Sequence, residues 1–260
     1  MKRRLVLFAL TVVLLLGVCA TPVAAAREGD FLYFVEGGEA VLSHYTGNAT
    51  VLAIPSTLGG YHVTKIEMYV FDQCNSLTSV IIPYTVTDIS RVAFSNCTSL
   101  TTIDVDLANP KYSCDASGVL YNKNMTMLIR CPEGKQGTFD ISNKVREIGV
   151  YAFSNCTGLT SVTIPTGVLK IGNCAFSDCA DLTSMAIPDG VTEIGMYAFY
   201  RCTDLKSVTI PSSVANIASA AFWRCPALTA INVEEDNQKY SCDASGVLYN
   251  KNMTMLIRCP

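Results

Sequence analysis

A Phe–Cys–Leu ladder with a period of 23 residues constrains this chain more than any other feature of its sequence. Each of six phenylalanines is followed by a cysteine three residues later and by a leucine three residues after that. The whole unit reads L-x-x-[IV]-x-I-P-x-x-V-x-x-I-x-x-x-A-F-x-x-C. Several positions that recur together at a fixed period indicate a repeat architecture. The ladder phenylalanines are Phe71, Phe94, Phe153, Phe176, Phe199 and Phe222.

One unit of the repeat is too small to fold by itself. In the unit that starts at Leu159, Val162 and Ile164 alternate with polar residues, which predicts a short strand with one buried face. Pro165 ends the strand because proline has no N–H to donate to a sheet. Burial of its large apolar side chains contributes roughly 10–15 kcal/mol, whereas ordering the unit costs on the order of 30 kcal/mol. The units must therefore stack into a solenoid with a shared core.

A second, longer repeat interrupts this rhythm. The stretch KYSCDASGVLYNKNMTMLIRCP occurs at 111–132 and again, with every residue the same, at 239–260. The interval from Phe94 to Phe153 exceeds the regular spacing by about one and a half units, so the stretch belongs to an insert between two plain units. The offset between the two copies equals four plain units and one insert, which indicates that a larger module was duplicated whole.

Residues 1–26 have the three parts of a secretory signal peptide. Basic residues 2–4 precede the apolar run LVLFALTVVLLLGVCA, and Ala24 and Ala26 provide small residues before a cleavage site. An uncleaved membrane anchor is the alternative, although the run is short for a membrane span. No second run of sufficient length follows, so we expect an exported mature chain with no membrane span.

Local patterns predict how the remaining chain is organised. Two alternating runs around Gly37-Gly38 predict a β-hairpin that caps the first coil. The extra residues at 59–63 are expected to form a loop. Each insert is expected to be a hairpin within the stack, turning at 122–124 or at 250–252. The expected organisation is a signal peptide at 1–26, a hairpin cap at 27–50, and a solenoid at 51–260 with inserts at about 106–137 and 234–260.

The repeat resembles the leucine-rich repeats of the BspA-like surface-protein family. The resemblance rests on AFSNCTSLTTI, AFSNCTGLTSVTIP, AFYRCTDLKSVTIP and AFWRCPALTAI, and on the insert GVLYNKNMTMLIRCP. It covers the chain from about residue 30 to residue 260. It implies a right-handed leucine-rich repeat solenoid, mainly β and irregular coil, with a parallel sheet on one face. It also implies an exported or cell-surface protein, because several members are adhesins that bind host proteins.

Cysteine has two expected roles in this chain. Removal of the signal peptide leaves 11 cysteines, and an exported protein with many cysteines suggests disulfides. The ladder cysteines, however, lie between a buried Phe and a buried Leu, where a free thiol acts as a small apolar side chain. Cys114 and Cys131 flank one insert hairpin, and Cys242 and Cys259 flank its copy. We therefore hypothesise that each of these two pairs forms a disulfide.

Several classes of function are not indicated by the sequence. A net charge of -3 and a pI of about 5.4 lack the basic footprint that nucleic-acid binding needs. The two histidines, His44 and His62, are not part of any nucleophile or acid–base pattern. No C-x-x-C pair, dinucleotide fingerprint or calcium-loop spacing occurs. We therefore expect no enzymatic activity, no cofactor and no metal site.

The outward positions of the predicted sheet form the candidate partner-binding face that the sequence favours over the return side of the coil. They are short and rich in hydroxyls, and threonine also occurs in strands simply because it favours a half-exposed sheet. Aromatic residues lie elsewhere, on the return side of the coil: Tyr69, Tyr151, Tyr197, Tyr200 and Trp223. The candidate sheet residues are Ser161, Thr163, Ser184, Ser207 and Thr209.

The sequence therefore predicts an exported or cell-surface protein that mediates adhesion or protein–protein interaction without catalysis. Its expected partner is an extracellular protein or glycan. We expect it to bind no nucleic acid, and we expect no membrane span in the mature chain. The alternative is a structural or glycan-binding surface array.

Overall fold

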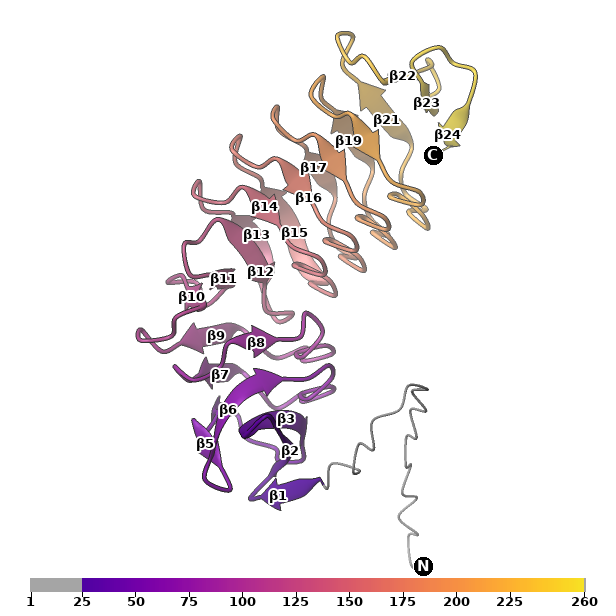
Figure 1. The fold of residues 1–260 in the computed structure, drawn as a ribbon. Coiled ribbons are helices and arrows are strands. Elements are labelled where there is room, and N and C mark those ends of the chain that lie inside the picture. Colours follow the sequence, from indigo (N-terminus) through magenta and orange to yellow (C-terminus); the bar gives the residue numbers. More distant parts are fainter. Residues whose placement is uncertain (1–24, 260) are drawn as a thin grey trace, which may run out of the picture.

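In the computed structural model, which describes residues 25–259, the chain is a solenoid built from strands and irregular coil (Figure 1). The described residues contain no helix. The predicted signal peptide lies almost wholly outside them. Each coil begins with a strand whose apolar side chains point inward, as the alternation predicts. In the six units of the ladder this strand lies at or just after the ladder leucine. These strands are β4 (Val51–Ala53), β7 (Ser79–Ile82), β9 (Thr102–Val105), β13 (Gln136–Asp140), β15 (Gly158–Thr163), β17 (Ser184–Ala186), β19 (Ser207–Ile210) and β21 (Ala230–Val233).

Short parallel strands also lie on the return side of the solenoid, in two separate sheets. Each of these strands is two residues long and ends on a buried or half-buried isoleucine, such as Ile171 or Ile194. The sequence pattern predicted only the first sheet. Two residues are too few to show a periodic pattern, so this pairing follows from the stacking of equal coils. Four of them pair in chain order: β14 (Glu147–Ile148), β16 (Lys170–Ile171), β18 (Glu193–Ile194) and β20 (Asn216–Ile217). The fifth, β8 (Asp88–Ile89), pairs with Lys65 and Ile66 in the N-terminal sheet.

The N-terminal end is closed by two hairpins. β2 (Phe31–Glu36) and β3 (Glu39–Tyr45) pair antiparallel around Gly37 and Gly38, whose φ angles of 60° and 84° only glycine adopts readily. β1 (Ala26–Glu28) extends this hairpin, and β3 joins β6 (Tyr61–Ile66) in parallel. The predicted cap is therefore present. The loop expected at 59–63 is instead a turn and a strand, because β5 (Thr57–Leu58) pairs with β6.

The ladder phenylalanines form a stack through the core. Rings on successive coils lie 4.9 Å apart for Phe153 and Phe176 and 5.3 Å apart for Phe176 and Phe199, with nearly parallel planes. The ladder cysteines run beside this stack. The Cys179 thiol donates to the Phe153 carbonyl at 3.1 Å, and the Cys202 thiol donates to the Phe176 carbonyl at 3.1 Å. Consecutive plain units are thus joined through ring stacking and a sulfur hydrogen bond.

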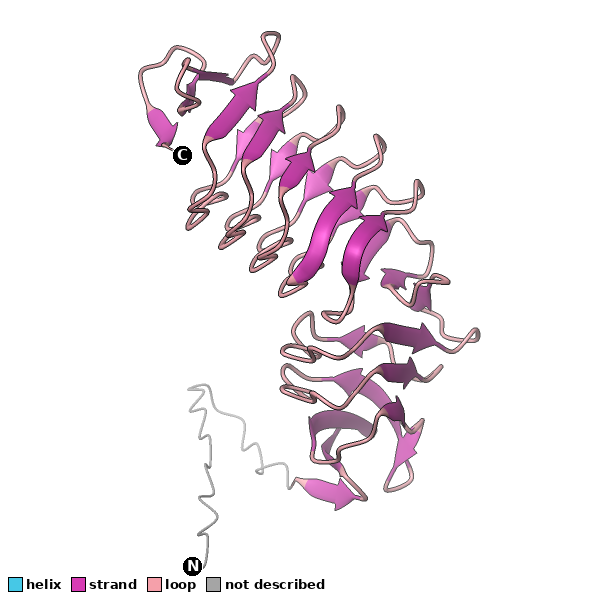
Figure 2. Ribbon diagram, turned by 180° about the vertical axis from the view of Figure 1, so that it is seen from behind, coloured by secondary structure: helices cyan, strands magenta, loops and turns pink. Residues whose placement is uncertain are grey.

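The first insert fills one position in the stack and divides the core in two. It forms β10 (Tyr112–Cys114), β11 (Leu120–Asn122) and β12 (Met127–Arg130), an antiparallel meander whose last strand pairs with β14. Neighbouring side chains of a strand point to opposite faces, so Leu120 enters the N-terminal core while Tyr121 enters the C-terminal one. The solenoid bends at this point (Figures 1 and 2).

The second insert has the same strands in a different environment. β22 (Tyr240–Cys242), β23 (Leu248–Asn250) and β24 (Leu256–Arg258) repeat the registers of the first copy. In the first copy, the coil that carries β14 covers β12, and Leu128 is completely buried. The equivalent Leu256 is 57% exposed. Identical segments therefore differ in burial only because of what packs against them.

The four insert cysteines are free thiols in the structure. Cys114 lies opposite Leu120, and Leu120 lies opposite Arg130, the neighbour of Cys131. β11 therefore lies between the two cysteines that the hypothesis joined. Two strand spacings amount to roughly 9.5 Å, beyond the separation of about 7 Å that a disulfide can span. Cys242 and Cys259 are separated by β23 in the same way.

Thiol labelling of the native protein should show that equivalent cysteines of the two inserts react at different rates. Burial raises the pKa of Cys97 to about 12 and that of Cys131 in the same direction, and the thiolate is the form that reacts. We expect Cys97, Cys131, Cys156 and Cys202 to stay unmodified until denaturation, whereas the exposed Cys259 reacts at once. Peptide mass mapping after brief alkylation measures how much of each cysteine has been modified. Fast native labelling of Cys131, or a Cys114–Cys131 cross-link, would contradict the described packing.

Candidate binding surfaces

The hydroxyl-rich positions predicted from the sequence lie on the first sheet. Ser184 of β17 pairs with Ser207 of β19, and Ala186 pairs with Thr209. Thr163, Ser184 and Thr209 are exposed, while Ser161 and Ser207 are half-buried between their neighbours. This surface, here called the sheet stripe, consists of short side chains on rigid strands. It offers hydrogen-bonding groups but no large side chain to anchor a partner.

A different surface forms at the turns that carry the ladder phenylalanines. Except at Val92, the residues two positions before and two positions after a ladder Phe have positive φ, for example 60° at Tyr151 and 62° at Asn155. Such angles are uncommon for residues other than glycine. Hydrogen bonds to the next coil hold them here, from Tyr151 N–H to Asn173 at 3.1 Å and from Asn155 N–H to Ser177 at 2.9 Å. The turn buries Phe153 and leaves Tyr151 and Asn155 half-exposed at the surface.

These turns line a hollow of about 480 Å³ that extends across both halves of the solenoid. Ser154 and Ser177 form part of its base, with their hydroxyl oxygens 2.8 Å apart. Most of the apolar lining is aromatic, and Tyr69 and Trp223 are 51% and 44% exposed. We call this surface the aromatic groove. The residues that line it include Tyr69, Ser95, Asn96, Tyr151, Ser154, Asn155, Cys174, Ser177, Asp178, Tyr197, Tyr200 and Trp223.

Three aromatic rings gather at the C-terminal end of the groove. The Trp223 ring centroid lies 5.5 Å from that of Tyr200 and 5.9 Å from that of Tyr197. Two arginines flank these rings, with the Arg224 guanidinium 4.9 Å from the Trp223 ring and the Arg201 guanidinium 5.9 Å from the Tyr200 ring. This end of the groove therefore combines tryptophan, tyrosine and arginine on one rigid edge.

Along the groove, large and small side chains alternate from coil to coil. At the position two residues before each ladder Phe, tyrosine is followed by a smaller residue in the next coil and then by tyrosine again. The tyrosines of this position therefore lie on every second unit of the ladder, with a smaller side chain between them. This pattern was visible in the sequence, but it repeats only every second unit. The residues at this position are Tyr69, Val92, Tyr151, Cys174, Tyr197 and Ala220.

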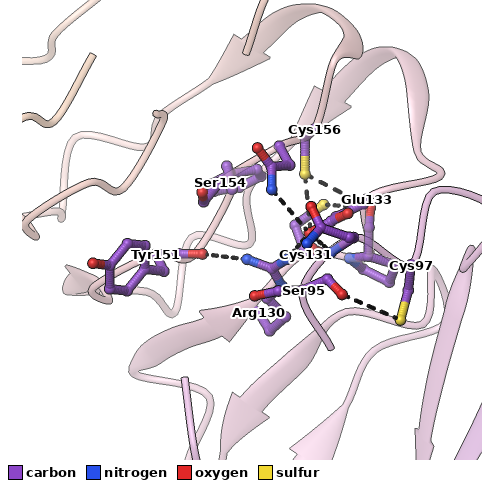
Figure 3. Close-up of polar contacts among 12 residues, drawn as sticks. Ser95, Cys97, Arg130, Cys131, Glu133, Tyr151, Ser154 and Cys156 are labelled. Atoms are coloured by element: carbon purple, nitrogen blue, oxygen red, sulfur yellow. Dashed lines mark hydrogen bonds and ion pairs between the residues drawn. The ribbon is translucent and has the colours of Figure 1, made fainter. Parts of the chain in front are cut away.

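A buried ion pair lies in the first insert, beside the groove (Figure 3). The Arg130 guanidinium donates to the Glu133 carboxylate, and both side chains are almost fully buried, at 3% and 1% exposed. Burial raises the pKa of the Glu133 carboxyl, and the positive charge of Arg130 opposes that rise. The sequence analysis singled out neither residue.

The ion pair connects the two halves of the groove. Glu133 accepts a hydrogen bond from the Asn96 N–H at 3.1 Å and one from the Asn155 side chain at 3.5 Å. Arg130 donates to the Tyr151 carbonyl at 2.7 Å. Asn96 precedes the insert, whereas Tyr151 and Asn155 follow it. The pair therefore holds groove residues from both sides of the bend in fixed positions.

Comparison with known proteins identifies the repeat. Six copies of the BspA type leucine rich repeat region match residues 44–123 and 133–244. The chain therefore belongs to the BspA-type leucine-rich repeat family, as the resemblance implied. No curated protein matches the sequence. Within residues 25–259, no helix could cross a membrane.

Solved structures share the solenoid fold. The pneumococcal vaccine antigen PcpA is 16% identical, with a TM-score of 0.57, and the match covers 83% of this chain and 82% of that one. A leucine-rich repeat protein from Eubacterium ventriosum is 20% identical, with a TM-score of 0.56 and coverage of 87% and 91%. A leucine rich cell surface protein from Faecalibacterium prausnitzii is 29% identical, with a TM-score of 0.48. That match covers 94% of this chain and 63% of the length of that protein.

Proposed function

We propose that this chain is an exported or cell-surface repeat protein that binds an extracellular protein through its aromatic groove and mediates adhesion without catalysis. The family supports a role in protein interaction. The leader pattern at positions 1–26 supports export. The observation that carries the proposal is the cluster of Tyr197, Tyr200 and Trp223 with its two arginines on a rigid edge.

The groove is a better binding surface than the sheet stripe. Tryptophan, tyrosine and arginine supply most of the binding energy at protein interfaces, whereas serine and threonine are under-represented among such hot spots. Backbone hydrogen bonds between coils fix the groove turns, so little conformational entropy is lost when a partner binds. The stripe at Ser161, Thr163, Ser184, Ser207 and Thr209 remains the second candidate face. A glycan partner or a purely structural array remains the alternative function.

A pair of matched variants tests which surface binds. One carries Tyr151→Ser, Tyr197→Ser and Trp223→Ser in the groove. The other carries Thr163→Lys, Ser184→Lys and Thr209→Lys on the stripe. The wild-type protein is screened on immobilised extracellular-matrix proteins and on a glycan array, and both variants are then titrated on the matrix protein that is bound most tightly. Because hot-spot residues contribute about 2 kcal/mol or more each, the groove variant should bind at least 30-fold more weakly.

The stripe variant should bind within about threefold of wild type, and thermal melts should show that both variants are folded. An unchanged groove variant together with a weakened stripe variant would assign binding to the sheet. Retention on glycans alone would favour the alternative function.

A further inference from the structure

The tyrosines of the groove are spaced in a way that suggests what binds there. Tyr151 and Tyr197 occupy the same position on coils two apart, with Cys174 between them. The rings of the phenylalanine stack give the coil spacing directly, as 4.9 Å and 5.3 Å for these two steps. Equivalent atoms of the two tyrosines are therefore about 10 Å apart, with a half-buried cysteine in the gap.

An extended proline-rich chain has nearly the same repeat. The polyproline II helix has three residues per turn and rises about 3.1 Å per residue, so one side recurs roughly every 9.3 Å. Grooves lined with aromatic residues are a recurring binding site for such segments. Building on the proposed function, we infer that the aromatic groove binds a single-chain, proline-rich segment of its protein partner, with prolines three residues apart seated on Tyr151 and Tyr197.

The polar groups of the groove suit the backbone of such a segment. A polyproline II chain makes no internal hydrogen bonds, so its carbonyl groups need donors from the protein. The tyrosine hydroxyls and the Trp223 N–H are donors along the aromatic side of the groove. At the base, one hydroxyl proton of the Ser154–Ser177 pair is used in the bond between them, which leaves the other free to donate to a bound carbonyl.

The charges in and beside the groove indicate which residue types the bound proline-rich segment should carry. Asp178 is the only charged residue among the lining, and Arg201 pairs with it at 3.3 Å. The middle of the groove therefore suits an uncharged chain. At the C-terminal end, Arg224 lies against Trp223 and donates to the Tyr200 hydroxyl at 3.3 Å. An acidic residue next to the prolines at this end would meet a positive charge.

A synthetic peptide tests the inference directly. The probe is a fluorescent twelve-residue peptide with proline at every third position, alanine elsewhere and one glutamate at one end. Its control has the same composition, with the same prolines placed at every second position over two thirds of its length. Fluorescence anisotropy with the purified protein should show saturable binding of the probe, at least tenfold tighter than that of the control. Failure of the probe to bind the wild-type protein would overturn the inference.

The variant Cys174→Tyr distinguishes ring spacing from simple aromatic adhesion. Cys174 has a φ of 53°, close to the 60° of Tyr151 and the 57° of Tyr197, so the backbone already accepts tyrosine at this position. The substitution adds an aromatic ring but fills the gap between the two sites. We expect at least a tenfold loss of probe binding. Equal or tighter binding would overturn the spacing argument. Tyr197→Ser provides a second test, in which the loss should be of similar size.

Two further arms separate this inference from the proposed function. A triple-helical peptide contains the same backbone conformation but presents three chains, and its binding in place of the single chain would overturn the assigned partner. If the probe fails while the groove variant still loses the matrix protein, the groove binds a partner of another kind. In that case the proposed function stands and the proline-rich ligand is rejected.

Discussion

Replacing Arg130 by alanine should lower the free energy of unfolding by about 3–5 kcal/mol, because the Glu133 carboxylate would remain buried without its partner. The substitution also removes the donor to the Tyr151 carbonyl at the edge of the groove. Chemical denaturation at neutral pH, followed by circular dichroism, measures the loss. The protein should also unfold with a broader transition, because the ion pair joins the parts of the solenoid on either side of the first insert.

The duplicated insert provides the control. Arg258 has the same sequence before it as Arg130, but its side chain is only half-buried, and the described residues give it no carboxylate partner. Arg258→Ala should cost less than about 1 kcal/mol. A double variant, Arg130→Met with Glu133→Leu, should recover most of the stability, since apolar residues of similar volume often replace a buried pair without loss. Equal losses for Arg130→Ala and Arg258→Ala would show that the pair is not important for stability.

Phe176→Ala should also destabilise the protein, by about 3–5 kcal/mol. The Phe176 ring is fully buried and stacks on Phe153 on one side and on Phe199 on the other, so its removal leaves a cavity in the middle of the ladder. Denaturant titration of the purified variant measures the effect. Tyr200→Ala, in the next coil, removes a half-exposed ring and should cost less than about 1 kcal/mol.

Hydrogen exchange of the Phe176→Ala variant should show where the cost falls. Each coil of a solenoid contacts only its neighbours, so the amides of 146–171 and 193–210 should lose protection, whereas those of the N-terminal cap should not. A loss of stability below about 1.5 kcal/mol would mean that the phenylalanine stack is not the main support of the coil.

Some of the fold could be predicted because a single local pattern determined it. The alternation after each ladder leucine identified the first sheet, and the Gly37-Gly38 pair identified the cap hairpin. The burial of Cys97, Cys156 and Cys202 followed from their place between buried Phe and Leu, and it is confirmed. Each of these features depends on residues within one unit, so the sequence of that unit was sufficient.

Features that depend on contacts between units could not be predicted in this way. Arg130 and Glu133 resemble surface charges, because charged residues are rarely buried unless they are paired, and their pairing depends on the coils around the insert. Leu128 and Leu256 have identical neighbours in sequence and opposite burial. The positive φ angles at Tyr151 and Arg201 were equally hidden, because neither residue type favours that conformation. The aromatic groove could not be predicted for the same reason, because contacts between units bring its residues together.

The most direct test of the account is hydrogen exchange of the protein bound to the matrix protein that it retains most tightly in the screen. If the partner binds in the aromatic groove, the backbone amides at the turns of residues 150–156, 196–202 and 220–225 should exchange more slowly in the complex. The amides of β15, β17 and β19 should change little. Protection of those three strands, with no change at the turns, would place the partner on the sheet stripe and contradict the account.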